Sequence, residues 1–184
     1  MRGYFGIGVE GINKPANLGN LVRSAHAFGA SFFFAINPDL DVEKMRVSDT
    51  ADSFDHVPFH EYDSLDEFSL PSKCQLVAIE LVDDSVNLPS FRHPTRAAYV
   101  LGPEMGNVSP EMMERCAHVV KIPTKFCINV GVAGALVMYD RALSMGHFSE
   151  GRFAPRPVMP GGPDFEFEEV DFNNRRKVRT DILR

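Results

Sequence analysis

The stretch from Ala97 to Pro110 most constrains the fold, because it reads as a strand, a loop and the start of a helix. Its run of β-favouring apolar residues ends at Gly102, and Ser109-Pro110 supplies a hydroxyl cap and a proline for the first turn of a helix. Glu104 lies in the loop beside Gly102 and Gly106, two glycines that allow a ligand to approach the backbone closely. Since α/β sheets bind ligands at the carboxyl ends of their strands, we expect a ligand site in this loop.

The rest of the chain alternates between strand-like and helix-like segments. Strands are expected at residues 4–9, 30–36, 75–81, 97–101 and 118–121, with helices at residues 18–28, 64–70 and 130–145. We expect Asn17 to cap the first of these helices and Asn129 to cap the last. This alternation predicts an α/β fold built on a parallel sheet.

Composition sets the size of the domain and limits its partners. With 184 residues, of which 44% are hydrophobic and 24% charged, the chain can bury one sizeable core. We expect one domain over residues 1–149, followed by a tail at 150–184 that is rich in proline and glycine and then basic. Residues 1–150 hold 12 basic and 19 acidic side chains, which argues against binding nucleic acid by bulk electrostatics. Any such binding must be local, and the tail's last ten residues, with five basic groups, are one candidate for it.

Several other classes of protein are disfavoured. No apolar run approaches a membrane span and no signal-peptide pattern is present, so we expect a cytoplasmic protein. His56 and His60 are separated by Pro58, which breaks the helix that would make them a metal-binding pair, and we expect no metal. The three cysteines lack paired spacing and are expected to be reduced thiols: Cys74, Cys116 and Cys127.

Three loops converge if the strand ends are adjacent, and each carries a recognisable motif. Asn17-Leu-Gly-Asn-Leu-Val-Arg23 resembles the pattern N-x-G-x-x-x-R, and Leu101-Gly-Pro-Glu-Met-Gly106 resembles L-G-x-E-x-x-G. The third motif has two pieces. Ile122-Pro matches I-P, and Cys127-Ile-Asn-Val-Gly-Val-Ala133 is similar to S-L-N-V-S-V-A. In this order, the motifs resemble those of the SpoU/TrmH family of RNA 2′-O-ribose methyltransferases, in the SPOUT superfamily, over about residues 3–147.

The resemblance implies a fold, a cofactor and partners. The fold would be a Rossmann-like parallel sheet with helices on both faces and a C-terminal deep trefoil knot. The cofactor would be S-adenosylmethionine, the substrate RNA, with transfer RNA favoured over ribosomal RNA, and the assembly a homodimer that shares its active sites. The separate N-terminal RNA-binding extension of the family is expected to be missing. Motif by motif, the family's catalytic positions fall on Asn17, Arg23, Glu104 and Asn129, and its cofactor contacts fall on Ile79, Leu101, Gly102, Ile122 and Ile128.

The motifs also depart from the family pattern, which keeps two other functions open. Cys127 and Gly131 stand where the family usually has serines, and the loop after Pro123 is shorter than usual. A knotted module that binds RNA or the cofactor without turnover is therefore one alternative. An unrelated nucleotide-dependent α/β enzyme is the other, although the glycines of the G-x-G-x-x-G match at Gly6–Gly11 lie inside the strand and not after it.

Overall fold

The computed structural model describes residues 3–43, 45, 53–104 and 106–146, which are built around a seven-stranded sheet. Every neighbouring pair of strands is parallel, in the order β3-β2-β1-β6-β4-β7-β5, as the alternating sequence predicts. The strands are β1 (Tyr4–Glu10), β2 (Phe32–Ile36), β3 (Phe59–Tyr62), β4 (Gln75–Ile79), β5 (Val86–Asn87), β6 (Arg96–Leu101) and β7 (His118–Lys121). The helices are α1 (Pro15–Phe28), α3 (Ser53–His56), α4 (Pro110–Arg115) and α5 (Val130–Ser144), with a 3-10 turn η1 (Leu88–Ser90).

Two of the three predicted helix caps are confirmed and one is wrong. Ser109 accepts a hydrogen bond from the backbone N–H of Met112 at the start of α4, and Asn129 caps α5. Helix α1, however, begins at Pro15, so Asn17 lies inside its first turn. Proline suits that position because its fixed φ is already helical and it has no N–H to satisfy. The side chain of Asn17 is thereby released for another contact.

The prediction of a helix at residues 64–70 is wrong. These residues form turns instead, and Phe68 packs its ring 5.0 Å from that of Phe34, centroid to centroid. So short a segment gains few helical hydrogen bonds, and burying one aromatic ring against the sheet outweighs them. Strands β3 and β5 were not predicted, because they are short edge elements with few buried side chains.

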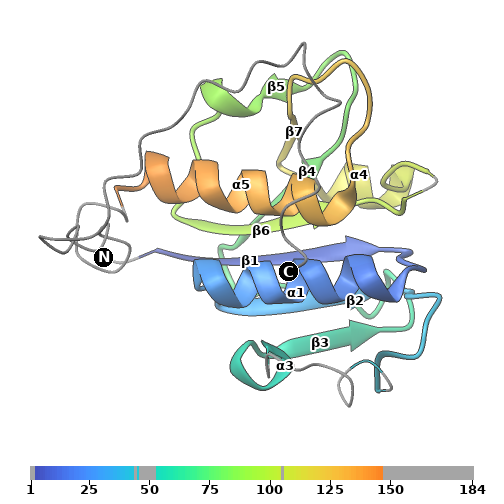
Figure 1. The fold of residues 1–184 in the computed structure, drawn as a ribbon. Helices are drawn as coiled ribbons and strands as arrows, with labels where there is room; N and C mark the ends of the chain where they lie inside the picture. The colour runs from blue at the N-terminus through green and yellow to red at the C-terminus, as the bar shows by residue number, and fades with distance from the viewer. Residues whose placement is uncertain (1–2, 44, 46–52, 105, 147–184) are drawn as a thin grey trace, which may run out of the picture. The chain divides into compact units, whose positions relative to one another are not determined.

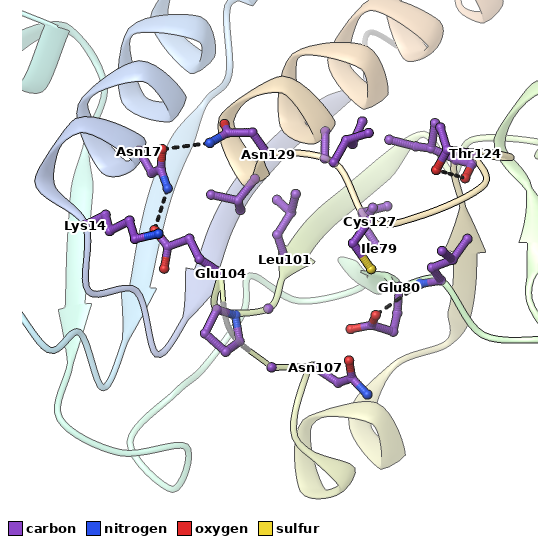
Figure 2. Close-up of a pocket in the computed structure, with 18 residues that line it drawn as sticks. Lys14, Asn17, Ile79, Glu80, Leu101, Glu104, Asn107, Thr124, Cys127 and Asn129 are labelled. Carbon is purple, nitrogen blue, oxygen red and sulfur yellow. Dashed lines mark hydrogen bonds between the residues drawn. The ribbon is translucent and has the colours of Figure 1, made fainter.

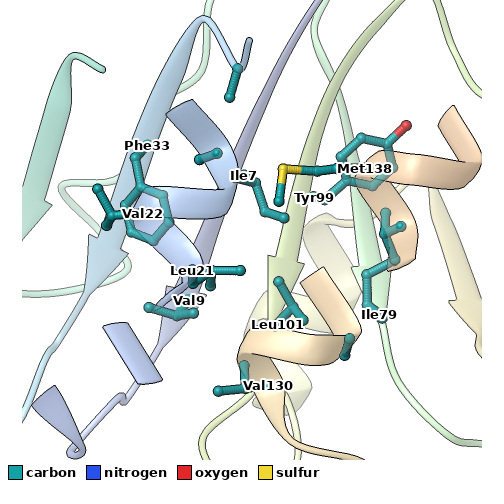
Figure 3. Close-up of a cluster of buried hydrophobic side chains, with 14 of the residues drawn as sticks. Ile7, Val9, Leu21, Val22, Phe33, Ile79, Tyr99, Leu101, Val130 and Met138 are labelled. Carbon is teal, nitrogen blue, oxygen red and sulfur yellow. The ribbon is translucent and has the colours of Figure 1, made fainter. Parts of the chain in front are cut away.

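Helices cover both faces of the sheet. On one face α1 and α5 lie side by side over the central strands (Figure 1), and Figure 3 shows the apolar cluster that they bury against β1, β4 and β6. The two helices approach closely at Gly134, where an added Cβ would lie 2.1 Å from Cδ1 of Leu21. On the other face, α4 and the 63–72 segment cover a second cluster that includes Phe34, Val100 and Met112. The two clusters alternate along each strand, as expected for a sheet buried on both faces.

The glycines of β1 serve packing. A Cβ on Gly6 or Gly8 would lie within 2.6 Å of the rings of Phe32 and Phe34, so these aromatic side chains occupy the space above the strand. None of the helices in the described ranges is long and apolar enough to cross a membrane. The predicted tail at 150–184 lies outside the described residues.

Candidate active site

A pocket of about 490 Å³ opens at the carboxyl ends of β4 and β6, beside the first turn of α5. The three motif loops meet there, as the sequence predicts, and each contributes lining residues: Lys14 and Asn17 from the first, Gly102, Pro103, Glu104, Gly106 and Asn107 from the second, and Ile122, Thr124 and residues 127–130 from the third. All five residues predicted to contact a cofactor line this pocket: Ile79, Leu101, Gly102, Ile122 and Ile128. Glu80 and Leu81 line it as well, because β4 ends at Ile79 and the chain turns there.

A chain of side-chain hydrogen bonds joins the three loops at the pocket wall (Figure 2). Asn17 donates from Nδ2 to Oε1 of Glu104 at 2.6 Å, and its Oδ1 accepts from Nδ2 of Asn129 at 2.9 Å. Asn129 in turn accepts the backbone N–H groups of Gly131 and Val132 through its own Oδ1. Asn17 is only 8% exposed, and its one amide connects the segments that follow β1, β6 and β7.

Glu104 retains an unused acceptor. Its Oε2 is buried and has no hydrogen-bond partner among the described residues. A buried carboxylate oxygen without a donor is costly, so the position favours a ligand or a second chain that supplies one.

Two carboxylates that sequence reasoning missed shape the loop between β6 and α4. Glu80 accepts the N–H of Val108 at 2.9 Å, and Glu10 accepts both the N–H and the hydroxyl of Ser109 at 2.8 and 2.6 Å. At Gly102 an added Cβ would lie 2.7 Å from the nitrogen of Val108, so the loop folds back on itself and only glycine fits. Both glutamates directly follow or end a strand, which is the signal that could have identified them.

Arg23 lies apart from the other predicted catalytic residues. It is exposed on α1, lines no part of the pocket, and makes no hydrogen bond or ion pair with any other described residue. The structure therefore brings together Asn17, Glu104 and Asn129 but leaves Arg23 free at the surface of its own chain.

The two departures from the family motif also lie at this site. Cys127 is exposed and lines the pocket. At Gly131 an added Cβ would lie 3.2 Å from Oδ1 of Asn129 and 3.3 Å from Cβ of Asn20. A serine there would press against the cap of α5, so glycine suits the packing of this chain.

Comparisons with known proteins agree with this architecture. The model of the SpoU rRNA Methylase family matches residues 5–139. The curated mouse protein "tRNA (guanosine(18)-2′-O)-methyltransferase TARBP1" is 26% identical over 139 residues, covering 70% of this chain and 9% of that protein. The chain thus matches only a small part of that relative's length.

Solved structures share the fold. The AdoMet-bound rRNA methyltransferase from Sinorhizobium meliloti superposes with a TM-score of 0.70 at 19% identity, covering 78% of this chain and 57% of that one. The AviRb methyltransferase from Streptomyces viridochromogenes, in complex with AdoMet, gives 0.71 at 19% identity, with coverages of 80% and 62%. A structure titled for the 2-OH methylation of C/U34 on tRNA gives 0.69 at 21% identity, with coverages of 80% and 99%.

Proposed function

The chain belongs to the SpoU rRNA methylase family, and we propose that it uses S-adenosylmethionine to methylate a ribose 2′-hydroxyl of RNA, with transfer RNA favoured over ribosomal RNA. The observation that carries this proposal is the pocket at the carboxyl ends of β4 and β6, where three motif loops are joined through Asn17. Ligands of open α/β sheets bind at this edge.

The residues present fit S-adenosylmethionine. The pocket volume of about 490 Å³ falls in the range that small-molecule sites occupy. The apolar side chains of Leu101, Ile122 and Ile128 would hold the cofactor, and Gly102 lines the pocket beside them. When bound, the cofactor supplies a methyl group on a sulfonium, which is a good leaving group.

The chain's own side chains must position the hydroxyl and its proton. A guanidinium stays protonated in proteins, so Arg23 is a poor acceptor for the proton of the 2′-hydroxyl. We therefore propose that Arg23 binds the RNA phosphate next to the reacting ribose, and that this phosphate accepts the proton. Asn17 and Asn129 would keep the loops in the reactive geometry, since each bonds to the other. Glu104 would hold Asn17 through one oxygen and accept a donor from the ligand or a second chain through the other.

A second copy of the chain would complete the site. Helix α5 presents four large apolar side chains at spacings of four, three and four residues, which places them on one helical face: Val132 (53% exposed), Leu136 (41%), Tyr139 (48%) and Leu143 (52%). We propose that this α5 stripe packs against a second copy to form the homodimer. Arg23, which lies outside its own pocket, would then serve the partner's pocket. We also propose that the C-terminal part of the domain forms a deep trefoil knot. A crystal structure of the dimer tests the interface and the knot.

The test is methyl transfer from labelled S-adenosylmethionine to total RNA, followed by digestion to nucleosides and mass spectrometry. We expect the label in a 2′-O-methyl nucleoside, and the size of the labelled RNA distinguishes transfer from ribosomal RNA. Arg23→Ala should abolish transfer and leave cofactor binding unchanged, whereas Arg115→Ala, a matched change on α4, should leave both intact. Label on a base, or full transfer by Arg23→Ala, would contradict the assignment.

A second candidate is a module that binds RNA or cofactor without turnover. Cys127 and Gly131 in place of serines favour it. Cofactor binding without any label in RNA would support this candidate over the enzyme.

A further inference from the structure

A second cavity, of about 610 Å³, lies at the opposite edge of the sheet from the candidate active site. It opens where β4, β6 and β7 begin, since Gln75, Arg96 and His118 are the first residues of these strands. Its remaining lining residues include Lys73, Arg92 and His93. Among the described residues that line the cavity, none is acidic. The cavity thus differs in sign from the chain as a whole, whose net charge is −6.

Lys73 occupies a backbone position that favours glycine. Its φ is +65°, and the N–H of Cys74 donates to the carbonyl of Pro71 at 3.0 Å, which makes Lys73 the third residue of a tight turn. Glycine or asparagine is the ordinary choice there, and a lysine costs free energy of folding. Such a residue is worth a functional explanation, because a strained conformation is retained where the side chain is needed.

Two cations of the cavity are available to a ligand. Lys73 and Arg92 are exposed and make no hydrogen bond or ion pair with any other described residue. The buried guanidinium of Arg141 donates to the carbonyls of two lining residues, Pro94 and Thr95, at 2.7 and 3.2 Å. Its charge is opposed by the carboxylate of Asp140, which bonds to His93 at 2.9 Å, so Lys73 and Arg92 remain the uncompensated cations of the cavity.

His93 forms part of the wall and does not supply a ligand contact. Its two ring nitrogens are engaged by the hydroxyl of Tyr99 at 2.5 Å and by the carboxylate of Asp140 at 2.9 Å. Burial lowers its pKa, which keeps the ring neutral. The positive charge of the cavity therefore comes from lysine and arginine, the groups that bind phosphate.

We propose that this cavity binds a backbone phosphate of the RNA substrate, through Lys73 and Arg92, at a distance from the methylated ribose. The inference rests on the proposed function. The acidic body of the chain offers no general attraction for RNA, so binding must come from local cations. Strands β4 and β6 run five and six residues between the two cavities, which is roughly 15–20 Å at about 3.3 Å per residue. An RNA that reaches both would be held by its backbone well outside the reacting nucleotide.

The test measures the affinity of the 184-residue chain for fluorescently labelled transfer RNA at several salt concentrations. Each lost phosphate contact should lower the salt slope by about 0.7–0.9 and, at 0.1 M salt, the affinity by about five- to eightfold. We expect this for Arg92→Gln and for Lys73→Gly, and no change for Arg115→Gln, whose cation is already paired with Asp66 at 3.4 Å. Lys73→Gly should also raise the midpoint of chemical unfolding, because it relieves the turn. Weaker binding by a more stable protein cannot come from damage to the fold.

The outcomes separate this proposal from the proposed function. If wild type transfers methyl groups to RNA while Lys73→Gly and Arg92→Gln bind RNA with the slope of wild type, the cavity proposal alone is overturned. If wild type binds cofactor but no RNA, both proposals fail. A titration with inorganic phosphate tests whether the ligand is free phosphate and not RNA. If phosphate saturates the cavity and RNA does not displace it, the cavity is a site for small anions and the RNA assignment is overturned.

Discussion

Replacing Asn17 by alanine tests whether one amide holds the three loops together. The change removes a hydrogen bond to the carboxylate of Glu104, about 1.5–3 kcal/mol, and one to Asn129, about 0.5–1.5 kcal/mol. Two effects offset part of this loss: alanine favours a helix more than asparagine by up to about 0.7 kcal/mol, and water can reach the exposed Asn129. We expect the free energy of unfolding to fall by about 1–3 kcal/mol, and Tm by roughly 3–10 °C in a chain of this size.

The assay is chemical denaturation, with cofactor affinity measured in parallel. Asn20→Ala is the matched control, because Asn20 lies one turn further along α1 and is exposed. We expect the control to stay within about 0.5 kcal/mol of wild type and Asn17→Ala to bind cofactor more weakly. Equal stability of the two variants would refute the claim that Asn17 organises the pocket.

The Asn17→Asp variant tests the hydrogen bond between Asn17 and Glu104 in a second way, through the pH dependence of stability. It would place a carboxylate against that of Glu104, which now lies 2.6 Å from the amide nitrogen. One of two carboxyls so close must hold a proton, so the pKa of the pair is raised relative to the unfolded chain. The variant should therefore approach wild-type stability at low pH and lose it as the pH rises. A defect independent of pH would contradict this geometry.

Three further predictions follow from the packing. Gly134→Ala should destabilise the fold by up to about 2 kcal/mol, because overpacking against Leu21 outweighs the gain in helix propensity. Gly19→Ala should stabilise the fold by up to about 1 kcal/mol, because the added Cβ meets only ordinary contacts there. Urea unfolding measures both changes. Burial lowers the pKa of His93 and raises that of Tyr99 to about 12, so stability should fall as the pH drops through the lowered histidine pKa and as it rises from 10 to 12. Tyr99→Phe should flatten the alkaline limb of that profile, and an unchanged limb would exclude the tyrosine as its source. Leu136→Asp, on the α5 stripe, should convert a dimer into monomers in sedimentation experiments, and a stable dimer would show that this face is not the interface.

Much of the fold followed from local signals. The parallel sheet was predictable because each central strand is a short apolar run bounded by turns, and β1, β2, β4, β6 and β7 lie where those runs do. The caps at Ser109 and Asn129 were predictable because the side chain bonds to its own helix. Edge strands β3 and β5 were not predictable, since they bury little and their pairing depends on partners distant in sequence.

The sequence predicted that the three motif loops meet, but it did not predict the contacts that their side chains make. Asn17 looked like a cap because it precedes a helical repeat, yet Pro15 starts the helix earlier and turns the amide toward Glu104. The roles of Glu10 and Glu80 depend on contacts with residues 99 and 28 positions away, which no local pattern encodes. The exposed position of Arg23, outside its own pocket, likewise required the fold.

The most direct test of the central claim, that the pocket binds S-adenosylmethionine, is calorimetric titration of the cofactor into wild type and two variants. Cys127→Trp adds bulk inside the pocket, and Lys125→Trp adds the same bulk on the same exposed loop, outside it. We predict saturable binding by wild type and Lys125→Trp and loss of binding by Cys127→Trp. Equal binding by all three proteins, or none by wild type, would contradict the assignment of this pocket.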